Sequence, residues 1–199
     1  MRTLTWLPGV ETPALIVREI EPRDWRAFSR FMLSPTYQRH IAMRFKDEDE
    51  VKAFVTRTVA RQGDERRNVF HLAAEAKSTG DTIGDGFIIL QRKGLAELGW
   101  GVDPSHWHQG LGTQIGRALL GLLFERLAAN RGWCKVMASN VASSRLARRI
   151  GLKHLRSHAN YPAGGGRIVL APDPIPKPAR PTALPAVHGY HAATVRRIP

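Results

Sequence analysis

Glycines, histidines and hydroxyl side chains are concentrated in one stretch of the chain, at a spacing that suits anion binding. The stretch reads Trp100-Gly-Val-Asp-Pro-Ser-His-Trp-His-Gln-Gly-Leu-Gly-Thr113. Gly110 and Gly112 would let backbone N–H groups come close to a ligand. A helix that begins directly after them would direct its unpaired N–H groups and the positive end of its dipole at the same place. Phosphate is the expected ligand, although a Gly-x-Gly pair alone is most often a simple turn.

The flanking elements therefore decide what this stretch means. Residues 95–102 precede it as an apolar strand in which Glu97 is the only ionisable side chain. Apolar residues at helical spacing follow it and lead to a stop signal at 130–132; they are Ile115, Leu119, Leu122, Leu123 and Leu127. A strand over 133–138 and a capped helix over 140–152, closed by Gly151, come next. The pattern predicts strand, glycine turn, helix, strand and helix.

This order of elements resembles the GNAT superfamily of acyl-CoA-dependent N-acetyltransferases. The matching motifs are Trp107-His-Gln-Gly-Leu-Gly-Thr113, Asn140-Val-Ala-Ser143 and Ile150-Gly-Leu152. Trp107 stands where many members carry Arg or Gln, and Asn-Val-Ala-Ser replaces the more general Asn-x-x-Ala form. Both features resemble the branch of RimJ/RimL-like ribosomal-protein N-terminal acetyltransferases. The detailed resemblance covers residues 95–155, and a looser one extends back to residue 15.

The resemblance implies an α/β (α+β) fold, with a mixed, mostly antiparallel central sheet of about six to seven strands flanked by about four helices. Helices are expected to open at 21–24 and at 47–50, where Asp47 and Glu50 have capping-box-like spacing. A hairpin is expected over 69–91, and two short strands after Gly151. We predict a GNAT-like domain over 1–170 and a Pro-rich extended or disordered tail over 171–199, where seven of the thirteen prolines lie.

Acetyl-CoA is the acyl donor that the resemblance implies. The backbone of the strand before the turn, Trp100, Gly101 and Val102, would hold the pantetheine and the acetyl carbonyl, with the Val102 amide as the best candidate. The pyrophosphate would lie on the amides of His108, Gln109, Gly110, Leu111, Gly112 and Thr113. On the following helix Arg145, Arg148 and Arg149 could reach the phosphates. No metal is expected, because no Cys or carboxylate stands at ligand spacing near His106 and His108.

Acetyl transfer to an amine requires a neutral amine, a polarised thioester carbonyl and a proton for the departing thiolate. The resemblance implies direct transfer in a ternary complex. Glu97 is the leading candidate to accept the amine proton, directly or through a water. A solvent-facing strand carboxylate is an equally good interpretation of Glu97, because strand alternation alone does not say which face points inward. His106 and His108 are the reserve candidates.

The tyrosine that serves as general acid in many GNAT enzymes is missing, because Ala147 occupies its position. Asn140 and Ser143 are the hydrogen-bonding groups expected near the thiol in this branch. Helix capping and turn closure are at least as good an explanation of these two residues. Solvent could also protonate the thiolate.

The formal net charge is +13, from 30 Lys and Arg against 17 Asp and Glu, so the surface attracts anions. The arginines are dispersed and no aromatic-interleaved RNA motif is present, so nucleic acid is not the favoured partner. No apolar run reaches the length of a membrane span, which argues against a membrane protein. The single cysteine, Cys134, is expected to be inert in the core and fits a reducing compartment, so we expect the cytoplasm.

The acceptor is the least determined part of the prediction. Its pocket would be formed by the first two helices, the segment 36–46 as a lid with Tyr37 and His40, and the C-terminal strands. A protein N-terminus and a small-molecule amine both remain open, as do a monomer and a homodimer. Two other function classes remain alternatives: a non-catalytic acyl-CoA-binding or regulatory domain, and a basic RNA- or ribosome-associated protein.

Overall fold

The computed structural model describes residues 6–41, 43–158 and 166–170, so the predicted tail over 171–199 lies outside the described residues. The strands are β1 (Val10–Glu11), β2 (Leu15–Glu19), β3 (Val69–Ala76), β4 (Thr82–Leu90), β5 (Leu95–Val102), β6 (Arg131–Met137), β7 (Lys153–His158) and β8 (Gly166–Leu170). The α-helices are α1 (Trp25–Met32), α2 (Pro35–Gln38), α3 (Glu48–Ala60), α4 (Leu111–Gly121) and α5 (Val141–Arg149).

All the strands belong to one sheet with the order β1-β2-β3-β4-β5-β6-β8-β7. Every neighbouring pair is antiparallel except β5 and β6, which are parallel. The mixed, mostly antiparallel α/β fold expected from the sequence is therefore confirmed. The described residues contain eight strands instead of six or seven, because the two-residue strand β1 adds to one edge. The two strands expected after Gly151 are present as the hairpin β7–β8.

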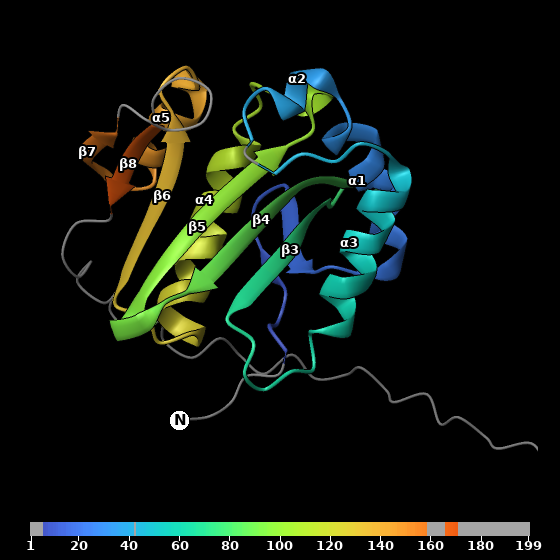
Figure 1. Ribbon diagram of the computed structural model, residues 1–199, viewed down its shortest axis with the longest axis horizontal. Helices are drawn as coiled ribbons and strands as arrows, with labels where there is room; N and C mark the ends of the chain where they lie inside the picture. Colours follow the sequence, from blue (N-terminus) through green and yellow to red (C-terminus); the bar gives the residue numbers. More distant parts are fainter. Residues whose placement is uncertain (1–5, 42, 159–165, 171–199) are drawn as a thin grey trace, which may run out of the picture.

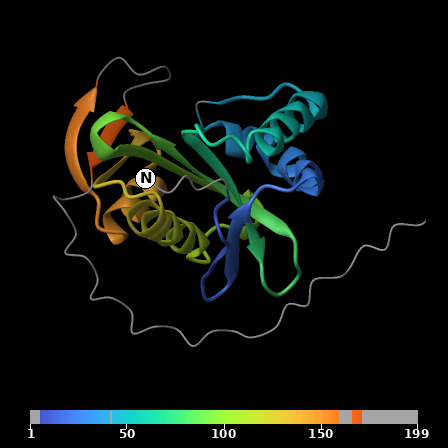
Figure 2. The ribbon, with the colours of Figure 1, turned by 90° about the horizontal axis from the view of Figure 1, so that it is seen from below.

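Helices cover both faces of the sheet, with α1 and α3 on one face and α4 on the other (Figures 1 and 2). Strand alternation sorts the side chains between the faces. On β3, Leu72 and Ala74 belong to the core cluster of α4, whereas Ala73 between them belongs to the cluster of α1 and α3. The same alternation assigns every site residue on β3, β4 and β5 to a face.

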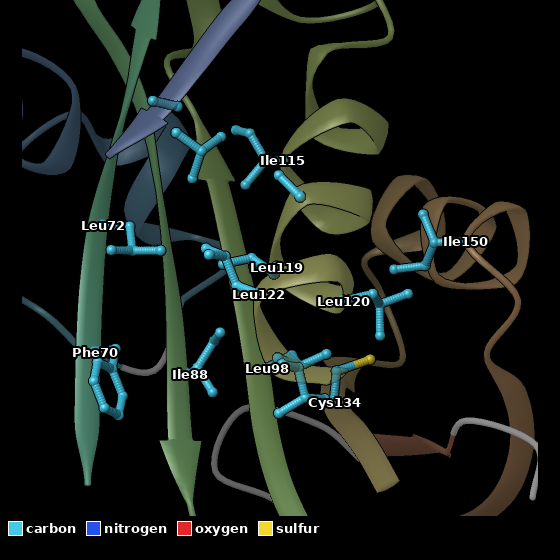
Figure 3. Packing of buried hydrophobic residues seen from close by; sticks show 14 of the residues in the cluster. Phe70, Leu72, Ile88, Leu98, Ile115, Leu119, Leu120, Leu122, Cys134 and Ile150 are labelled. Atoms are coloured by element: carbon cyan, nitrogen blue, oxygen red, sulfur yellow. The ribbon is translucent and has the colours of Figure 1, made fainter. Parts of the chain in front are cut away.

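The larger core lies between the sheet and helices α4 and α5 (Figure 3). Ile115 and Leu119 of α4 are fully buried, as the helical spacing predicts, and they pack over glycines of β4. Burying a side chain of this size contributes about 1.5–3 kcal/mol. This packing fixes the position of the N-terminus of α4 relative to the sheet.

The smaller core lies between the sheet and helices α1 and α3, and it is rich in aromatic rings. Phe28 and Phe31 of α1 pack edge to face with centroids 5.6 Å apart, and Val51 and Val55 of α3 are buried beside them. Asp47 caps α3 as expected, because its Oδ1 accepts a hydrogen bond from the Glu50 N–H at 2.9 Å. The cap fixes where this helix begins.

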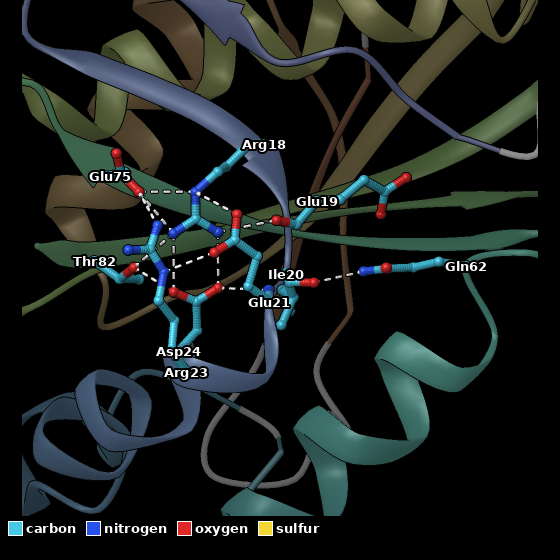
Figure 4. A network of polar contacts seen from close by, with 9 residues as sticks. All are labelled: Arg18, Glu19, Ile20, Glu21, Arg23, Asp24, Gln62, Glu75 and Thr82. Atoms are coloured by element: carbon cyan, nitrogen blue, oxygen red, sulfur yellow. Dashed lines mark hydrogen bonds and ion pairs between the residues drawn. The ribbon is translucent and has the colours of Figure 1, made fainter. Parts of the chain in front are cut away.

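A buried polar network ties the start of α1 to the sheet (Figure 4). Arg18 of β2 makes paired contacts with Asp24, at 2.8 and 3.0 Å, and contacts Glu75 of β3 at 2.8 Å. The hydroxyl of Thr82 also donates to Asp24, at 2.6 Å. Burial disfavours the Asp24 carboxylate, but the hydrogen bonds that it accepts outweigh burial and hold the pKa of Asp24 below its usual range.

The helix after the glycine turn ends earlier than the sequence predicted. The α-helical ladder of α4 stops at Gly121, and the π-helical turn Leu122–Arg126 follows it, with the Leu127 N–H bonded to the Leu122 carbonyl at 3.0 Å. The apolar spacing continues through this turn, so periodicity alone could not reveal the change from α-helical to π-helical hydrogen bonding. Strand β6 accordingly begins at Arg131.

Candidate active site

Strands β5 and β6 separate along their length (Figure 1). Residues of both strands line a cavity at this place. Their parallel pairing spans only Leu95–Glu97 with Arg131–Trp133, although the strands run on to Val102 and Met137. The cavity has a volume of about 790 Å³. We call the side formed by β5, residues 103–113 and α5 the glycine-loop half, and the side formed by α2, α3, β3 and β4 the aromatic half.

Strand β5 directs backbone groups into this gap. The Asp103 N–H bonds to the Ile83 carbonyl at 2.9 Å, which makes Val102 and Gly84 a non-hydrogen-bonded pair. In such a pair the N–H and C=O of each residue point away from the partner strand. The backbone N–H and C=O of Val102 therefore face the side on which β6 has separated. By alternation, those of Trp100 face the same side. The Val102 carbonyl accepts the indole N–H of Trp107 at 2.8 Å, whereas its N–H has no partner on β4.

The loop before α4 adopts the left-handed backbone that such a turn requires. His108 has φ of 63° and Gly110 has φ of 77°, and Gly110 is the N-cap residue of α4 without a side-chain cap. The N–H groups of Thr113 and Gln114 turn back to the Gly110 carbonyl. Those of Leu111 and Gly112, at the first two helical positions, have no intrahelical acceptor. The helix N-terminus therefore offers donors to an anion in the gap.

Gly112 has a packing role that the sequence did not reveal. A Cβ on this residue would lie 2.6 Å from Cδ1 of Leu146. A Cβ on Gly116, one turn later, would lie 2.9 Å from Cδ1 of Ile150. The two glycines let α5 approach α4 closely, and this contact places the residues of α5 beside the gap.

The first turn of α5 presents two polar residues to the cavity. Oδ1 of Asn140 accepts the Ser143 N–H at 3.0 Å, so Asn140 is the N-cap of this helix. Both residues line the cavity. Ala147, where the resembled family often has a tyrosine, is fully buried. The capping role of Asn140 leaves its side-chain NH₂ and the Ser143 hydroxyl as the polar groups available to a ligand.

Two exposed arginines of α5 line the same half. Arg145 and Arg149 stand one helical turn apart, and neither forms an ion pair with any described residue. Arg148, the third arginine considered from the sequence, does not line the cavity. Uncommitted guanidinium groups beside a helix N-terminus favour a phosphate-bearing ligand.

Glu97 faces the aromatic half of the cavity. Its neighbours Ala96 and Leu98 are buried in the α4 core, so alternation turns the Glu97 side chain to the opposite face. There it forms an ion pair with Lys135 of β6 at 3.3 Å and lines the cavity. The inward orientation that the sequence left open is thus the one observed. The role of Glu97 in proton transfer stays a prediction.

The aromatic half contains a polar chain that the sequence analysis missed. The hydroxyl of Tyr37 donates to Oδ1 of Asp85 at 2.6 Å, and Nε2 of His71 lies 2.9 Å from Oδ2 of the same carboxylate. All three side chains are buried and line the cavity. Burial raises the pKa of Tyr37 well above its usual value, and the charge of Asp85 and the hydrogen bond to it add to this effect. The phenol therefore keeps its proton.

Of the three hydrogen-bonded residues, only Tyr37 gave a signal in the sequence. Tyr37 falls in the segment expected to close the acceptor pocket, whereas His71 and Asp85 look like ordinary residues of a hairpin. The clue was the glycines on both sides of Asp85. On β4, Gly84 and Gly86 lie against Ile115 and Leu119, which turns Asp85 to the other face.

The remaining candidates have limited roles. Cys134 is buried. Burial and, to a smaller extent, the nearby charge of Glu97 raise the pKa of its thiol to about 12, so the thiol is a poor nucleophile. His106 and His108 line the cavity beside the loop. Among the described residues, no group of His, Cys, Asp or Glu could hold a metal ion. Within the same part of the chain, no helix has the length and apolar character to cross a membrane.

The amino-acid sequence is similar to those of known proteins. The profile of the acetyltransferase (GNAT) domain matches residues 14–153. An uncharacterized N-acetyltransferase of Bacillus subtilis, YoaA, is 27% identical over 148 residues, which cover 73% of this chain and 83% of that protein.

Two solved structures illustrate the similarity of fold. The ribosomal-protein-S5-alanine acetyltransferase of Vibrio fischeri has a TM-score of 0.74 at 13% identity, over 86% of this chain and 100% of that one. RimJ of Mycobacterium smegmatis, in complex with a CoA-disulfide, has a TM-score of 0.70 at 18% identity, over 83% and 88% of the two chains. Because the family profile covers most of the chain, the protein belongs to the GNAT family of acetyltransferases.

Proposed function

We propose that the protein transfers an acetyl group from acetyl-CoA to a primary amine, by direct transfer in a ternary complex. The observation that carries this proposal is the convergence of unpaired backbone N–H groups on the gap between β5 and β6. One set comes from Val102 and Trp100 on the strand, and the other from the uncapped N-terminus of α4. These groups suit an acyl carbonyl at one end and a pyrophosphate at the other.

The residues that would hold acetyl-CoA all belong to the glycine-loop half. The amides of residues 108–112 would bind the pyrophosphate, whereas the Thr113 amide, which the sequence also suggested, is bonded to the Gly110 carbonyl. Arg145 and Arg149 would contact further phosphate oxygens. The backbone of Trp100, Gly101 and Val102 would bind the pantetheine and the acetyl carbonyl. Bound there, the coenzyme supplies an activated acetyl thioester. The volume of the cavity and the charge of its rim fit such a long anionic molecule.

Three side chains are proposed to assist the chemistry. Glu97, held by Lys135, is the candidate that the sequence favoured for the amine proton, and it could act only through a water, because it stands some distance along β5 from Val102. The side-chain NH₂ of Asn140 and the hydroxyl of Ser143 would stabilise the leaving thiolate. No covalent enzyme intermediate is needed, since the one cysteine is buried and protonated.

The acceptor is proposed to be a protein N-terminus or a small-molecule amine. Support for the first comes from the similar fold of ribosomal-protein acetyltransferases. The wall of the aromatic half is apolar, with Met43 and Val69 exposed at its rim. Both Glu97 and Asp85 already have partners there, so an acceptor with a single amine fits better than a polycation.

Calorimetric titration with acetyl-CoA, followed by thiol release with a panel of amines, tests this proposal. We expect saturable binding at one site and thiol release that depends on the amine. Binding without thiol release would favour a non-catalytic acyl-CoA-binding domain. Absence of binding would reject the acetyltransferase proposal and favour an RNA- or ribosome-associated protein, whose affinity should collapse as salt rises.

A further inference from the structure

The polar chain Tyr37–Asp85–His71 has no part in the mechanism described so far. Its members come from α2, β4 and β3 and are joined by hydrogen bonds of 2.6 and 2.9 Å. Buried polar groups are costly unless they are paired, and a paired chain that faces a cavity is able to hold and pass a proton. The position of these three residues and their ability to take up a proton indicate their role.

Asp85 lies level with the part of β5 that is proposed to hold the acetyl group. It stands directly opposite Gly101, one residue before Val102. A Cβ on Gly101 would overlap both the Tyr37 hydroxyl and the Asp85 carboxylate, so the two groups lie against the strand at this point. Glu97 lies four residues away, about 13 Å along the strand. Of the two carboxylates that line the cavity, Asp85 is therefore closer to the proposed acyl position than Glu97.

The Asp85–His71 pair is able to accept a proton. Tyr37 occupies Oδ1 of Asp85 as a donor, and the imidazole shares Oδ2 through its Nε2. Within the described residues, Nδ1 of His71 forms no hydrogen bond. An imidazole held by a carboxylate at one nitrogen has a lone pair available at the other. A proton added here is shared between two groups that are joined by a hydrogen bond.

The surroundings of His71 contain few other charges. The edge of the Phe54 ring from α3 lies against the imidazole at a centroid distance of 4.8 Å, and Phe87 of β4 lies at 5.9 Å. The titratable and charged groups that line the cavity around the imidazole are Tyr37 and His40 from α2 and the turn after it, Asp85 from β4, Glu97 from β5 and Lys135 from β6. Glu97 and Lys135 neutralise one another.

We propose that the Asp85–His71 pair, oriented by Tyr37, takes the place of Glu97 and accepts the proton that the acceptor amine loses during acetyl transfer. The inference rests on the proposed function. The amine nitrogen forms a bond to the carbonyl carbon, and the carbon–sulfur bond breaks. The N–H proton passes to the pair, directly or through one water, and the leaving thiolate takes a proton from solvent. The pair then returns its proton to solvent for the next cycle.

Thiol release from acetyl-CoA tests the proposal, with phenethylamine, an alanine-initiated tetrapeptide and water alone as the acceptors. His71→Gln and Asp85→Asn should each lower kcat by about 10²–10³, the usual contribution of a positioned base. The double variant should lose no more than the worse single variant, because the two groups act as a unit. Glu97→Gln should lose less than about tenfold. His154→Gln makes the same change at an exposed histidine of β7 and should leave the rate unchanged.

The pH profile separates a proton acceptor from a structural pair. In His71→Gln the acid limb of kcat/KM should move to lower pH, since a carboxylate ionises at lower pH than an imidazole. In Tyr37→Phe the limb should move to higher pH, because the Asp85 carboxylate loses a stabilising donor. A pair that only supports the fold would lower the rate and leave both limbs in place.

Several results would overturn the proposal. One is a loss below tenfold in His71→Gln and Asp85→Asn, and another is a larger loss in Glu97→Gln than in either. Should these two variants fail to fold, Tyr37→Phe decides, because it removes only one hydroxyl, and an unmoved acid limb contradicts the proposal. Failure of the proposed function would look different: the wild-type protein would not bind acetyl-CoA, or would release no thiol above the uncatalysed rate.

Discussion

The two halves of the cavity are built by different means. In the glycine-loop half, the groups that face a ligand are backbone N–H groups of β5, the loop and the first turn of α4. In the aromatic half they are side chains, and Tyr37 is separated from Asp85 by 48 positions in the sequence. A backbone site depends on local conformation, whereas a side-chain site depends on strand register and on the docking of helices.

The two halves should therefore be damaged by different kinds of substitution. A change of local φ should damage the glycine-loop half and leave the rest of the protein intact. A change in a buried contact should damage the aromatic half together with the stability of the fold. Gly101 is the point at which the halves meet, because its backbone belongs to one and its missing side chain makes room for the other.

The largest effect is expected from Asp24→Asn, which weakens the network that anchors the start of α1. The Asp24 side chain is 2% exposed, and removing one partner of a buried ion pair costs about 3 kcal/mol. Because its pKa is lowered in the folded protein, Asp24 contributes stability above the unfolded pKa of about 4 and loses it as the pH falls through the folded value.

Urea unfolding at neutral and acid pH measures this effect. The wild-type advantage over Asp24→Asn should be full at pH 7 and should shrink in acid. Asp81→Asn, at an exposed turn, is the matched control and should change the free energy of unfolding by less than about 0.5 kcal/mol. An advantage that persists unchanged in strong acid would contradict the assigned ionic role.

Gly110→Val should weaken acetyl-CoA binding by about tenfold or more, because a side chain at positive φ costs about 1–2 kcal/mol. Gly80→Val is the matched control. Gly80 has φ of 76°, close to the 77° of Gly110, and neither has an atom near its Cβ position. Calorimetry should therefore separate the two variants although their backbone strain is similar. Equal affinities would show that the loop conformation is not part of the binding site.

Gly101→Ala should disturb the contact between the halves, because its methyl group would displace the Tyr37 hydroxyl from Asp85. Overpacking of this kind costs about 1–3 kcal/mol of stability. Amine-dependent thiol release should fall by a larger factor than acetyl-CoA affinity. Gly63→Ala adds the same methyl group in open space and should change neither. A variant that loses affinity but keeps full turnover at saturation would contradict the arrangement.

Gly112→Ala should have the smallest effect. Leu146 must shift to make room, which offsets the gain in helix propensity of up to about 1 kcal/mol that alanine brings. Gly121→Ala, in open space at the end of the same helix, should keep that gain. Thermal unfolding compares the two variants, and calorimetry should find acetyl-CoA affinity unchanged in both. A selective loss of affinity in Gly112→Ala would show that this glycine makes room for the ligand.

The fold could be predicted from the sequence to a large extent, because its signals are local. Alternation, helical spacing and the capping of α3 by Asp47 each follow from a few consecutive residues. The end of α4 could not be predicted, since the π-helical turn over 122–126 keeps the same apolar spacing. The eighth strand was missed because a two-residue strand carries almost no pattern of its own.

The strand, glycine loop and helix that present N–H groups to a ligand follow from local sequence, because backbone geometry responds to neighbouring residues. Which side chains meet depends on the tertiary structure. The pairing of β3 with β4 brought His71 to Asp85, the docking of α2 brought Tyr37 to the same carboxylate, and strand alternation turned Glu97 inward. Such contacts depend on register and packing over the whole sheet, where a shift of one residue would turn each side chain to the opposite face.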